Sequence, residues 1–237
     1  MNLYYITGTS SGLGLALATQ LLEQEDNVVI GISRRTVIKH KRYHHITHDL
    51  TTPLSTEVFE PMDESYSRIV LINNAGDVGP VTPVGSQSFE EVSNNYKLNL
   101  TVPSVLCNYF VDTYKGNTSA LRMIINISSG AGKHPIESWS TYCASKAALD
   151  MFSEVLQLEH PDFKVFSVAP GIVDTPMQEA IRSADKEQFP HLDRFISYKK
   201  DGELASAREV ASKFVYILDN SESFDTVQFS VRDLKND

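Results

Sequence analysis

Thr7-Gly-Thr-Ser-Ser-Gly-Leu-Gly14 is the stretch that decides the fold. The short apolar run Leu3-Tyr-Tyr-Ile6 precedes it, and a helical pattern of leucines follows and ends near Asp26. A second apolar run, Asn27-Val-Val-Ile-Gly-Ile-Ser33, comes next. The stretch is therefore a glycine-rich turn between a strand and a helix, at the start of an α/β pattern.

Glycines in such a turn let backbone N–H groups approach a ligand, and the start of the helix adds the positive end of its dipole. The turn predicts a site for an anion such as a pyrophosphate, although an ordinary glycine-rich turn would look the same. No Gly-Lys-Ser/Thr follows, so a P-loop nucleotide hydrolase is excluded on motif grounds. The residues expected to contact the anion are Gly8, Ser10, Ser11, Gly12, Leu13 and Gly14.

Similar apolar runs alternate with helical patterns along the rest of the chain, which predicts a parallel sheet covered on both faces. The expected fold is α/β, a Rossmann-type doubly wound, mostly parallel seven-stranded sheet with helices on both faces, in three αβα layers. The expected strands are 3–6, 27–33, 43–47, 69–72, 123–127, 164–168 and 226–231, and the later helices are 89–99, 101–114, 140–158 and 207–218. One domain is expected over 1–237, with a partly helical lid at 176–202.

The composition limits the choice of partners. The chain has 21 basic and 30 acidic side chains and a net charge of −9, which argues against a nucleic-acid partner or an anionic membrane surface. No apolar run is long enough to span a membrane and no signal peptide is evident, so a cytoplasmic protein is expected. Cys107 and Cys143 do not make a disulfide framework. His44, His45 and His48 allow a metal site, but a solvated strand edge is favoured and no metal is predicted.

The second and third strands end in residues that indicate a nucleotide cofactor. The second ends in Ser33-Arg34-Arg35, where an NAD-binding protein would usually have an acid for the ribose hydroxyls. Guanidinium groups match a 2′-phosphate in charge and geometry, so NADP(H) is the predicted cofactor, with a solvated basic loop as the alternative. Asp49, which ends the third strand before Leu50, is expected to accept from the adenine amino group, and both residues are predicted cofactor contacts.

Three further strand ends should meet at the same edge of the sheet. Asn73-Asn-Ala-Gly76 closes the fourth strand, Ile127-Ser-Ser129 the fifth, and Pro170-Gly-Ile-Val-Asp-Thr175 the sixth. Such turns suit ligand contact, because ligands of open α/β sheets bind at the carboxyl ends of the strands, and they equally suit hydrogen bonds that hold the sheet. The predicted cofactor contacts here are Asn74, Ala75, Gly76, Pro170, Gly171, Ile172, Val173 and Thr175.

Tyr142 and Lys146 lie four residues apart, so a helix would place both side chains on one face, one turn apart. A phenol has a pKa of roughly 10 and is a poor acid at neutral pH, and a nearby ammonium is expected to lower that pKa. The pair is therefore a candidate proton donor with its activating group. The plain alternative for Tyr142 is a core aromatic.

The chain resembles the short-chain dehydrogenase/reductase superfamily over essentially its whole length. The resemblance rests on motifs in the family's order, which are Thr7-Gly-x-x-x-Gly-x-Gly14, Asn73-Asn-Ala-Gly76, Ser129, Tyr142-x-x-x-Lys146 and Pro170-Gly171. It implies that Tyr142 donates a proton to the substrate oxygen, that Ser129 orients that oxygen, and that Lys146 holds the nicotinamide ribose. It also implies that Asn99 positions a water beside Lys146 and that Thr175 binds the carboxamide.

Within the superfamily, Asn73-Asn-Ala-Gly-Asp-Val-Gly79 and the Ser-Arg pair are similar to the sepiapterin reductase-like and benzil reductase-like group. This similarity implies NADPH-dependent reduction of a small-molecule carbonyl, a ketone or a 1,2-diketone. Gln228 stands where sepiapterin reductases have a pterin-anchoring Asp, which favours a diketone over a pterin. The expected substrate contacts are Ser129, Trp139, Tyr142 and Gly171, although Trp139 equally suits packing.

Other functions remain open at this point. A non-catalytic NADP(H)-binding redox sensor would keep the same nucleotide fold, and an NAD-dependent alcohol dehydrogenase would share the catalytic set. Relatives commonly associate through the helices expected at 101–114 and 140–158, which implies a homodimer or homotetramer.

Overall fold

The computed structural model describes residues 1–59 and 65–234. Its centre is a seven-stranded parallel sheet in the order β3-β2-β1-β4-β5-β6-β9. The strands of this sheet are β1 (Asn2–Thr7), β2 (Asn27–Ser33), β3 (Tyr43–Thr47), β4 (Arg68–Asn73), β5 (Leu121–Ile127), β6 (Lys164–Ala169) and β9 (Gln228–Ser230). The strand order reverses beside β1, which is where open α/β sheets form a crevice for ligands.

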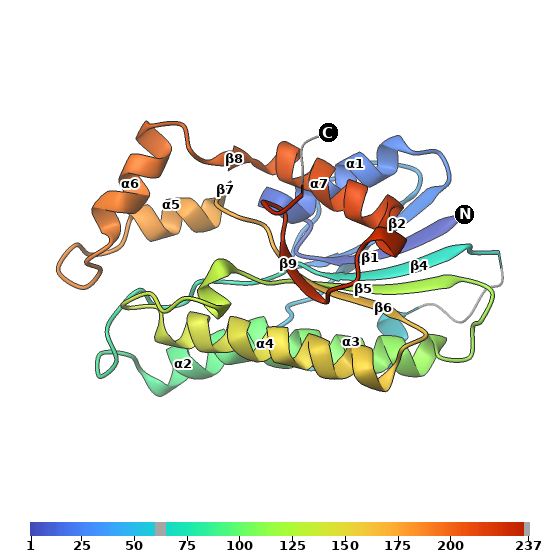
Figure 1. Cartoon of the computed structure of the whole chain (residues 1–237), viewed down its shortest axis with the longest axis horizontal. Helices are drawn as coiled ribbons and strands as arrows, with labels where there is room; N and C mark the ends of the chain where they lie inside the picture. The colour runs from blue at the N-terminus through green and yellow to red at the C-terminus, as the bar shows by residue number, and fades with distance from the viewer. Residues whose placement is uncertain (60–64, 235–237) are drawn as a thin grey trace.

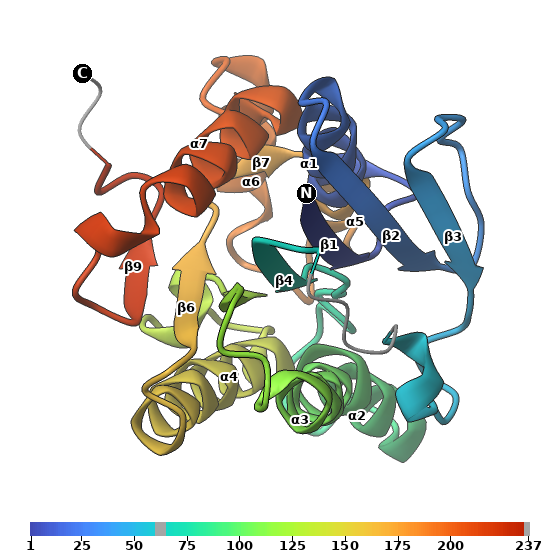
Figure 2. The same ribbon diagram turned by 90° about the vertical axis from the view of Figure 1, so that its right-hand side faces the viewer.

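Helices cover both faces of the sheet, as Figures 1 and 2 show. One face carries α1 (Gly12–Glu23) and α7 (Ala207–Asp219), and the other carries α2 (Phe89–Tyr96), α3 (Val102–Tyr114) and α4 (Ser140–Glu159). Successive residues of a strand point to opposite faces, so β1 supplies both cores. Tyr4 and Ile6 lie in the first apolar cluster, and Leu3 and Tyr5 in the second. The predicted α/β fold with three layers is confirmed.

Some element boundaries differ from the prediction. The first helix ends at Glu23 because Gln24 already has an extended backbone, with φ −86° and ψ 129°. The last strand is shorter than expected, at Gln228–Ser230. Helices α2 and α3 were expected as separate segments, but the π-helical turn Lys97–Thr101 joins them. Short 3-10 turns cover Thr56–Val58, Gly130–Gly132 and Ser221–Ser223.

Segment 176–202 is partly helical, with α5 (Pro176–Arg182) and α6 (Leu192–Lys200). Both helices stand beyond the carboxyl ends of the strands (Figure 1). The small strands β7 (Val173–Asp174) and β8 (Ala205–Ser206) pair where the segment leaves and rejoins the main body. A third apolar cluster joins this segment to α4, and its aromatic members are Trp139, Tyr142, Phe189, Phe195 and Tyr198.

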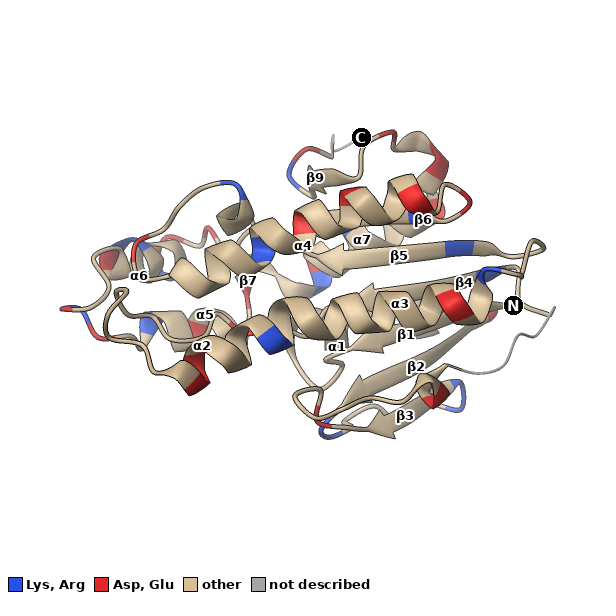
Figure 3. Cartoon of the chain, turned by 90° about the horizontal axis from the view of Figure 1, so that it is seen from below, with Lys and Arg blue, Asp and Glu red and all other residues tan. Residues whose placement is uncertain are grey.

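Helices α3 and α4 lie next to each other at the surface (Figure 2). Asp112 is the single charged residue of α3, whereas α4 carries Lys146, Asp150, Glu154 and Glu159 (Figure 3). Among residues 1–59 and 65–234, no helix combines the length and the apolar character that crossing a bilayer requires.

Candidate active site

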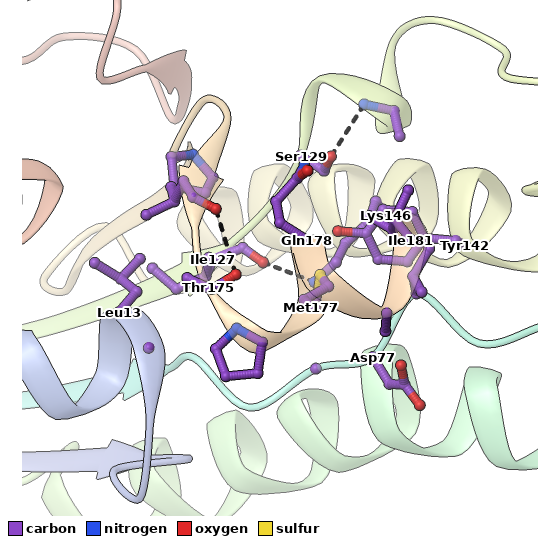
Figure 4. A pocket seen from close by; sticks show the side chains of 18 of the residues that line it. Leu13, Asp77, Ile127, Ser129, Tyr142, Lys146, Thr175, Met177, Gln178 and Ile181 are labelled. Atoms are coloured by element: carbon purple, nitrogen blue, oxygen red, sulfur yellow. Dashed lines mark hydrogen bonds between the residues drawn. The ribbon is translucent and has the colours of Figure 1, made fainter. Parts of the chain in front are cut away.

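A cavity of about 850 Å³ lies at the carboxyl ends of the strands, between the glycine turn and segment 176–202 (Figure 4). Nearly all of the predicted site residues line it. They are Gly8, Ser10, Ser11, Gly12, Leu13, Ser33, Arg34, Asp49, Leu50, Asn74, Ala75, Gly76, Ser129, Trp139, Tyr142, Lys146, Pro170, Gly171, Ile172, Val173 and Thr175. Gly14, Arg35 and Asn99 are not among the lining residues.

The glycine turn owes its shape to two positive φ angles, 75° at Gly8 and 56° at Gly12, which residues with a side chain rarely adopt. Gly14 has a different role. A Cβ at Gly14 would stand 2.4 Å from the Gly8 carbonyl oxygen and 2.4 Å from Asn74 Nδ2. Gly14 therefore lets α1 pack closely against the turn, from behind the cavity wall.

Hydrogen bonds tie the turn to the end of β4. The backbone N–H groups of Asn74 and Ala75 both donate to Thr7 Oγ1 at 2.9 Å, and Asn74 Nδ2 donates to the Thr7 carbonyl at 2.9 Å. The bare backbone at Gly8 and Gly12 and the start of α1 face the cavity. These residues fit the pyrophosphate of a dinucleotide, because a helix start with open N–H groups attracts an anion.

The structure separates the two arginines that follow β2. Arg34 lines the cavity, whereas Arg35 does not. Asp49 lies near Arg34, and one of its oxygens accepts from the Thr51 N–H at 3.0 Å and from Thr51 Oγ1 at 2.8 Å. These hydrogen bonds, above all the one from the Thr51 backbone, hold the pKa of Asp49 below its usual value. Asp49 is therefore a charged acceptor at this end of the cavity.

Tyr142 lies in the first turn of α4 and is only 6% exposed. Burial raises the pKa of Tyr142 to about 12, and a hydrogen bond with Ser129 partly opposes the rise. Lys146 Nζ lies 5.8 Å from the centre of the Tyr142 ring. The predicted lowering of the Tyr142 pKa is wrong for the protein chain alone, because burial of the phenol is the largest cause of the shift and raises the pKa. Tyr142 is a neutral phenol throughout the physiological pH range.

Lys146 lies one turn further along α4 and is 5% exposed. Its Nζ donates to the Ile127 carbonyl at 2.8 Å, at the end of β5. Burial lowers the pKa of Lys146 to about 8, and the negative charge of Asp150 opposes this effect. The ammonium group is thus held toward the cavity by the strand end that also carries Ser129.

Ser129 and Asn99 are held by hydrogen bonds to nearby backbone. Ser129 Oγ accepts from the Ala131 N–H at 3.2 Å, at the start of the 3-10 turn Gly130–Gly132 (Figure 4). Asn99 lies in the π-helical turn, donates to the Asp77 carbonyl at 2.7 Å and accepts from the Asp77 N–H at 3.0 Å. Asn99 therefore holds the loop after β4 from behind the cavity wall.

A family model described as short chain dehydrogenase matches residues 2–186, which is most of the chain and includes the glycine turn, Ser129, Tyr142 and Lys146. The chain belongs to the short-chain dehydrogenase/reductase family. This family consists of oxidoreductases, and the prediction of the family from the sequence is confirmed.

Two curated relatives place this short-chain dehydrogenase/reductase more closely. A benzil reductase ((S)-benzoin forming) of Bacillus subtilis is 37% identical over 97% of this chain and 100% of the relative. A sepiapterin reductase of Rattus norvegicus is 32% identical over 90% of this chain and 89% of the relative. The predicted similarity to the benzil reductase-like and sepiapterin reductase-like group is confirmed.

Solved structures share the fold at lower identity. A short-chain dehydrogenase/reductase of Saccharomyces cerevisiae has a TM-score of 0.82 at 24% identity, over 98% of this chain and 97% of that one. A 4-hydroxyisoleucine dehydrogenase in complex with NADH has a TM-score of 0.78 at 22% identity, over 97% and 96%. A serine dehydrogenase in complex with NADP⁺ has a TM-score of 0.77 at 18% identity, over 96% and 93%. Proteins of this fold thus bind either nicotinamide cofactor.

Sequence reasoning missed several residues that line the cavity of this short-chain dehydrogenase/reductase. They come from the loops after β4 and β5, from segment 176–202 and from the C-terminal segment, and they include Asp77, Val78, His134, Met177, Gln178, Ile181, His191, Arg194, Phe195, Tyr198 and Arg232. The sequence marked segment 176–202 as a lid but carried no signal for which of its side chains face inward.

Asp150, which acts on Lys146 from behind the cavity, was also missed. It is 5% exposed and accepts from Ser167 Oγ at 2.6 Å. Its position four residues after Lys146, one helical turn further along α4, is a signal that the sequence carries.

The charge on Lys146 predicts a pH dependence. Because the pKa of Lys146 is lowered to about 8, the ammonium is present below that pH and is lost above it. We expect kcat/KM for carbonyl reduction to be flat near neutral pH and to fall as the pH rises through about 8. Steady-state rates across this range measure it, with Lys146→Arg as the comparison because a guanidinium keeps its charge. An unchanged rate up to about pH 10 would contradict a role for the charged lysine.

Proposed function

We propose that the chain is an NADP(H)-dependent carbonyl reductase that reduces an aromatic 1,2-diketone of the benzil type. The observation that carries this proposal is that Ser129, Tyr142 and Lys146 line one cavity together with the glycine turn. The 37% identity to a benzil reductase over nearly the whole of both chains supports the substrate class.

In the proposed reaction the chain's residues bind the substrate oxygen and supply its proton. Bound NADPH would supply the hydride that the carbonyl carbon receives. Ser129 Oγ hydrogen-bonds the carbonyl oxygen, and the Tyr142 hydroxyl gives its proton to the same oxygen as negative charge develops there. Lys146 holds the ribose hydroxyls of the cofactor, while Asn99 keeps the loop at Asp77 in place.

The protonation state of Tyr142 suits the role of proton donor to the carbonyl oxygen. A pKa of about 12 leaves the phenol protonated at neutral pH, so the residue is a ready acid.

The position of Arg34 supports NADP(H) as the cofactor, and it yields a test. Arg34→Asp is expected to lower the kcat/KM ratio of NADPH over NADH by more than about tenfold, because charge-assisted hydrogen bonds to the 2′-phosphate are lost. Arg35→Asp is the matched control, since Arg35 does not line the cavity, and it should change the ratio much less. An unchanged cofactor ratio in both variants would overturn the assignment of NADP(H).

The function itself is tested by following NADPH consumption with benzil, other aromatic 1,2-diketones and sepiapterin. We expect turnover of a diketone. Preferential turnover of sepiapterin would instead support the second candidate, a pterin reductase, which the 32% identity to a sepiapterin reductase favours. NADPH binding without reduction of any carbonyl in the panel would favour a redox sensor.

We also propose that the chain forms a homodimer or homotetramer through α3 and α4. Large apolar side chains are exposed on α4, at Met151, Val155 and Leu158. Asp112 is the single charged residue of the neighbouring α3 (Figure 3). Exposed apolar side chains of this kind favour association with a second copy.

A further inference from the structure

The wall of the cavity near Tyr142 contains buried polar atoms that have no partner among the described residues. They are Ser128 Oγ, Trp139 Nε1 and Gln178 Oε1. Each of the three side chains is more than nine-tenths buried, with 4%, 5% and 8% exposed, respectively. A buried polar atom without a hydrogen bond costs free energy, so these atoms are suited to partners that a ligand brings.

Gln178 is the most informative of the three. It lies on α5, three residues after Thr175, and Figure 4 shows it at the same cavity as Ser129, Tyr142 and Lys146. Its neighbours on the helix, Met177 and Ile181, also line the cavity and are apolar. A buried amide on an otherwise apolar helix face can bind one polar group of a ligand at a defined place.

The rest of this wall suits aromatic groups. The Trp139 ring packs against Phe189 and Phe195, with ring centres 5.8 Å and 5.2 Å away, and meets Tyr142 edge to face at 5.6 Å. The indole is therefore fixed on several sides, whereas no hydrogen bond from residues 1–59 or 65–234 holds the Gln178 amide oxygen. The amide group can also turn to present either its oxygen or its N–H₂ to a ligand.

We propose that Gln178 binds the second oxygen of the substrate, the one that is not reduced, and thereby selects ketones that carry a carbonyl or hydroxyl on the neighbouring carbon. This inference rests on the proposed carbonyl reductase function. The Gln178 N–H₂ donates to a second carbonyl, as in a 1,2-diketone, or its oxygen accepts from a hydroxyl, as in an α-hydroxy ketone. Ser129 and Tyr142 remain with the reacting oxygen. Gln178 is thus a specificity residue that touches the substrate.

The test compares two substrates that differ by one oxygen. Benzil has two carbonyls, and deoxybenzoin is the same molecule with one carbonyl replaced by methylene. We expect Gln178→Met to lower kcat/KM for benzil about tenfold, because one partner of a buried hydrogen bond is removed, and to change kcat/KM for deoxybenzoin less than about twofold. The quantity to compare between wild type and variant is the ratio of kcat/KM for benzil to kcat/KM for deoxybenzoin. The greater intrinsic reactivity of the diketone affects both proteins equally and cancels.

Two further variants make the result specific. Gln178→Glu keeps an acceptor but loses the N–H donor, so it should also lower kcat/KM for benzil more than kcat/KM for deoxybenzoin. Ile181→Val is the matched control, because it changes the shape of the same helix face without a hydrogen-bonding group and should affect both substrates alike.

The outcomes separate this inference from the function on which it rests. A wild-type protein that reduces neither ketone would overturn both. A wild type that reduces benzil, combined with equal losses on both substrates in Gln178→Met and Gln178→Glu, would overturn only the role of Gln178. Loss of the benzil preference in Trp139→Phe but not in the Gln178 variants would assign the second oxygen to the indole N–H and likewise overturn it.

Discussion

Tyr142→Phe is expected to lower kcat for carbonyl reduction by roughly a thousandfold, because positioned general acids contribute about 10²- to 10⁴-fold. The substitution removes only the hydroxyl, and the ring keeps its edge-to-face contact with Trp139 at 5.6 Å. The hydroxyl is neutral, with a pKa of about 12, so no charge is removed from the cavity. Steady-state kinetics with a diketone measure the loss, and NADPH affinity should stay within about twofold.

Tyr216→Phe is the matched control, since Tyr216 is 50% exposed on α7 and does not line the cavity. It should leave kcat unchanged. A Tyr142→Phe variant that keeps more than about a tenth of the wild-type kcat would show that another group, or water, supplies the proton.

Gly14→Ala is expected to destabilise the protein by about 1 kcal/mol and to weaken NADPH binding. Alanine stabilises a helix by about 1 kcal/mol relative to glycine. Its Cβ, however, would overlap the Gly8 carbonyl, and overpacking of this kind costs roughly 1–3 kcal/mol. The Gly8 backbone cannot easily yield, because its N–H donates to Ile32 at 2.8 Å in the sheet. The cost of overpacking therefore exceeds the gain in helix propensity. The glycine turn, which faces the proposed cofactor site, must open to make room for the Cβ.

Urea unfolding and NADPH titration measure both effects of Gly14→Ala. Gly130→Ala is the comparison for stability, because a Cβ at Gly130 meets no atom within 4 Å. It should change the free energy of unfolding by less than about 0.5 kcal/mol. Equal stability of the two variants would mean that α1 can move away from the turn without cost.

The sequence predicted the sheet well because its strands are buried on both faces. β1, β2, β4, β5 and β6 are almost wholly buried, so their apolar runs are nearly continuous and easy to recognise. The edge strand β9 has only partly buried residues, and its predicted length was too great. The π-helical turn at Lys97–Thr101 was also missed, since local composition does not distinguish it from a break between two helices.

The candidate site was predicted to the extent that strand ends determine it. Pro170 directly follows β6, and Ser129 lies two residues after the end of β5, so their meeting at one edge follows from the parallel sheet. The predicted direction of the Tyr142 pKa shift was wrong because the shift depends on burial by Trp139 and segment 176–202, which no local pattern encodes. The separation of Arg34 from Arg35 was likewise not predictable from two adjacent, chemically identical residues.

The sequence by itself determined the fold class, the family and the positions of the glycine turn, Tyr142 and Lys146, because periodicity, backbone freedom and helical spacing are local properties of the chain. Only the tertiary structure decided which side chains face the cavity and how burial sets their pKa values. Gln178 shows the difference most clearly. Its amide oxygen is buried without a partner among the described residues, and this burial arises only when α5 packs with Trp139 and Tyr142. Desolvation and enclosure arise from segments distant in sequence, and they exist only after those segments have come together.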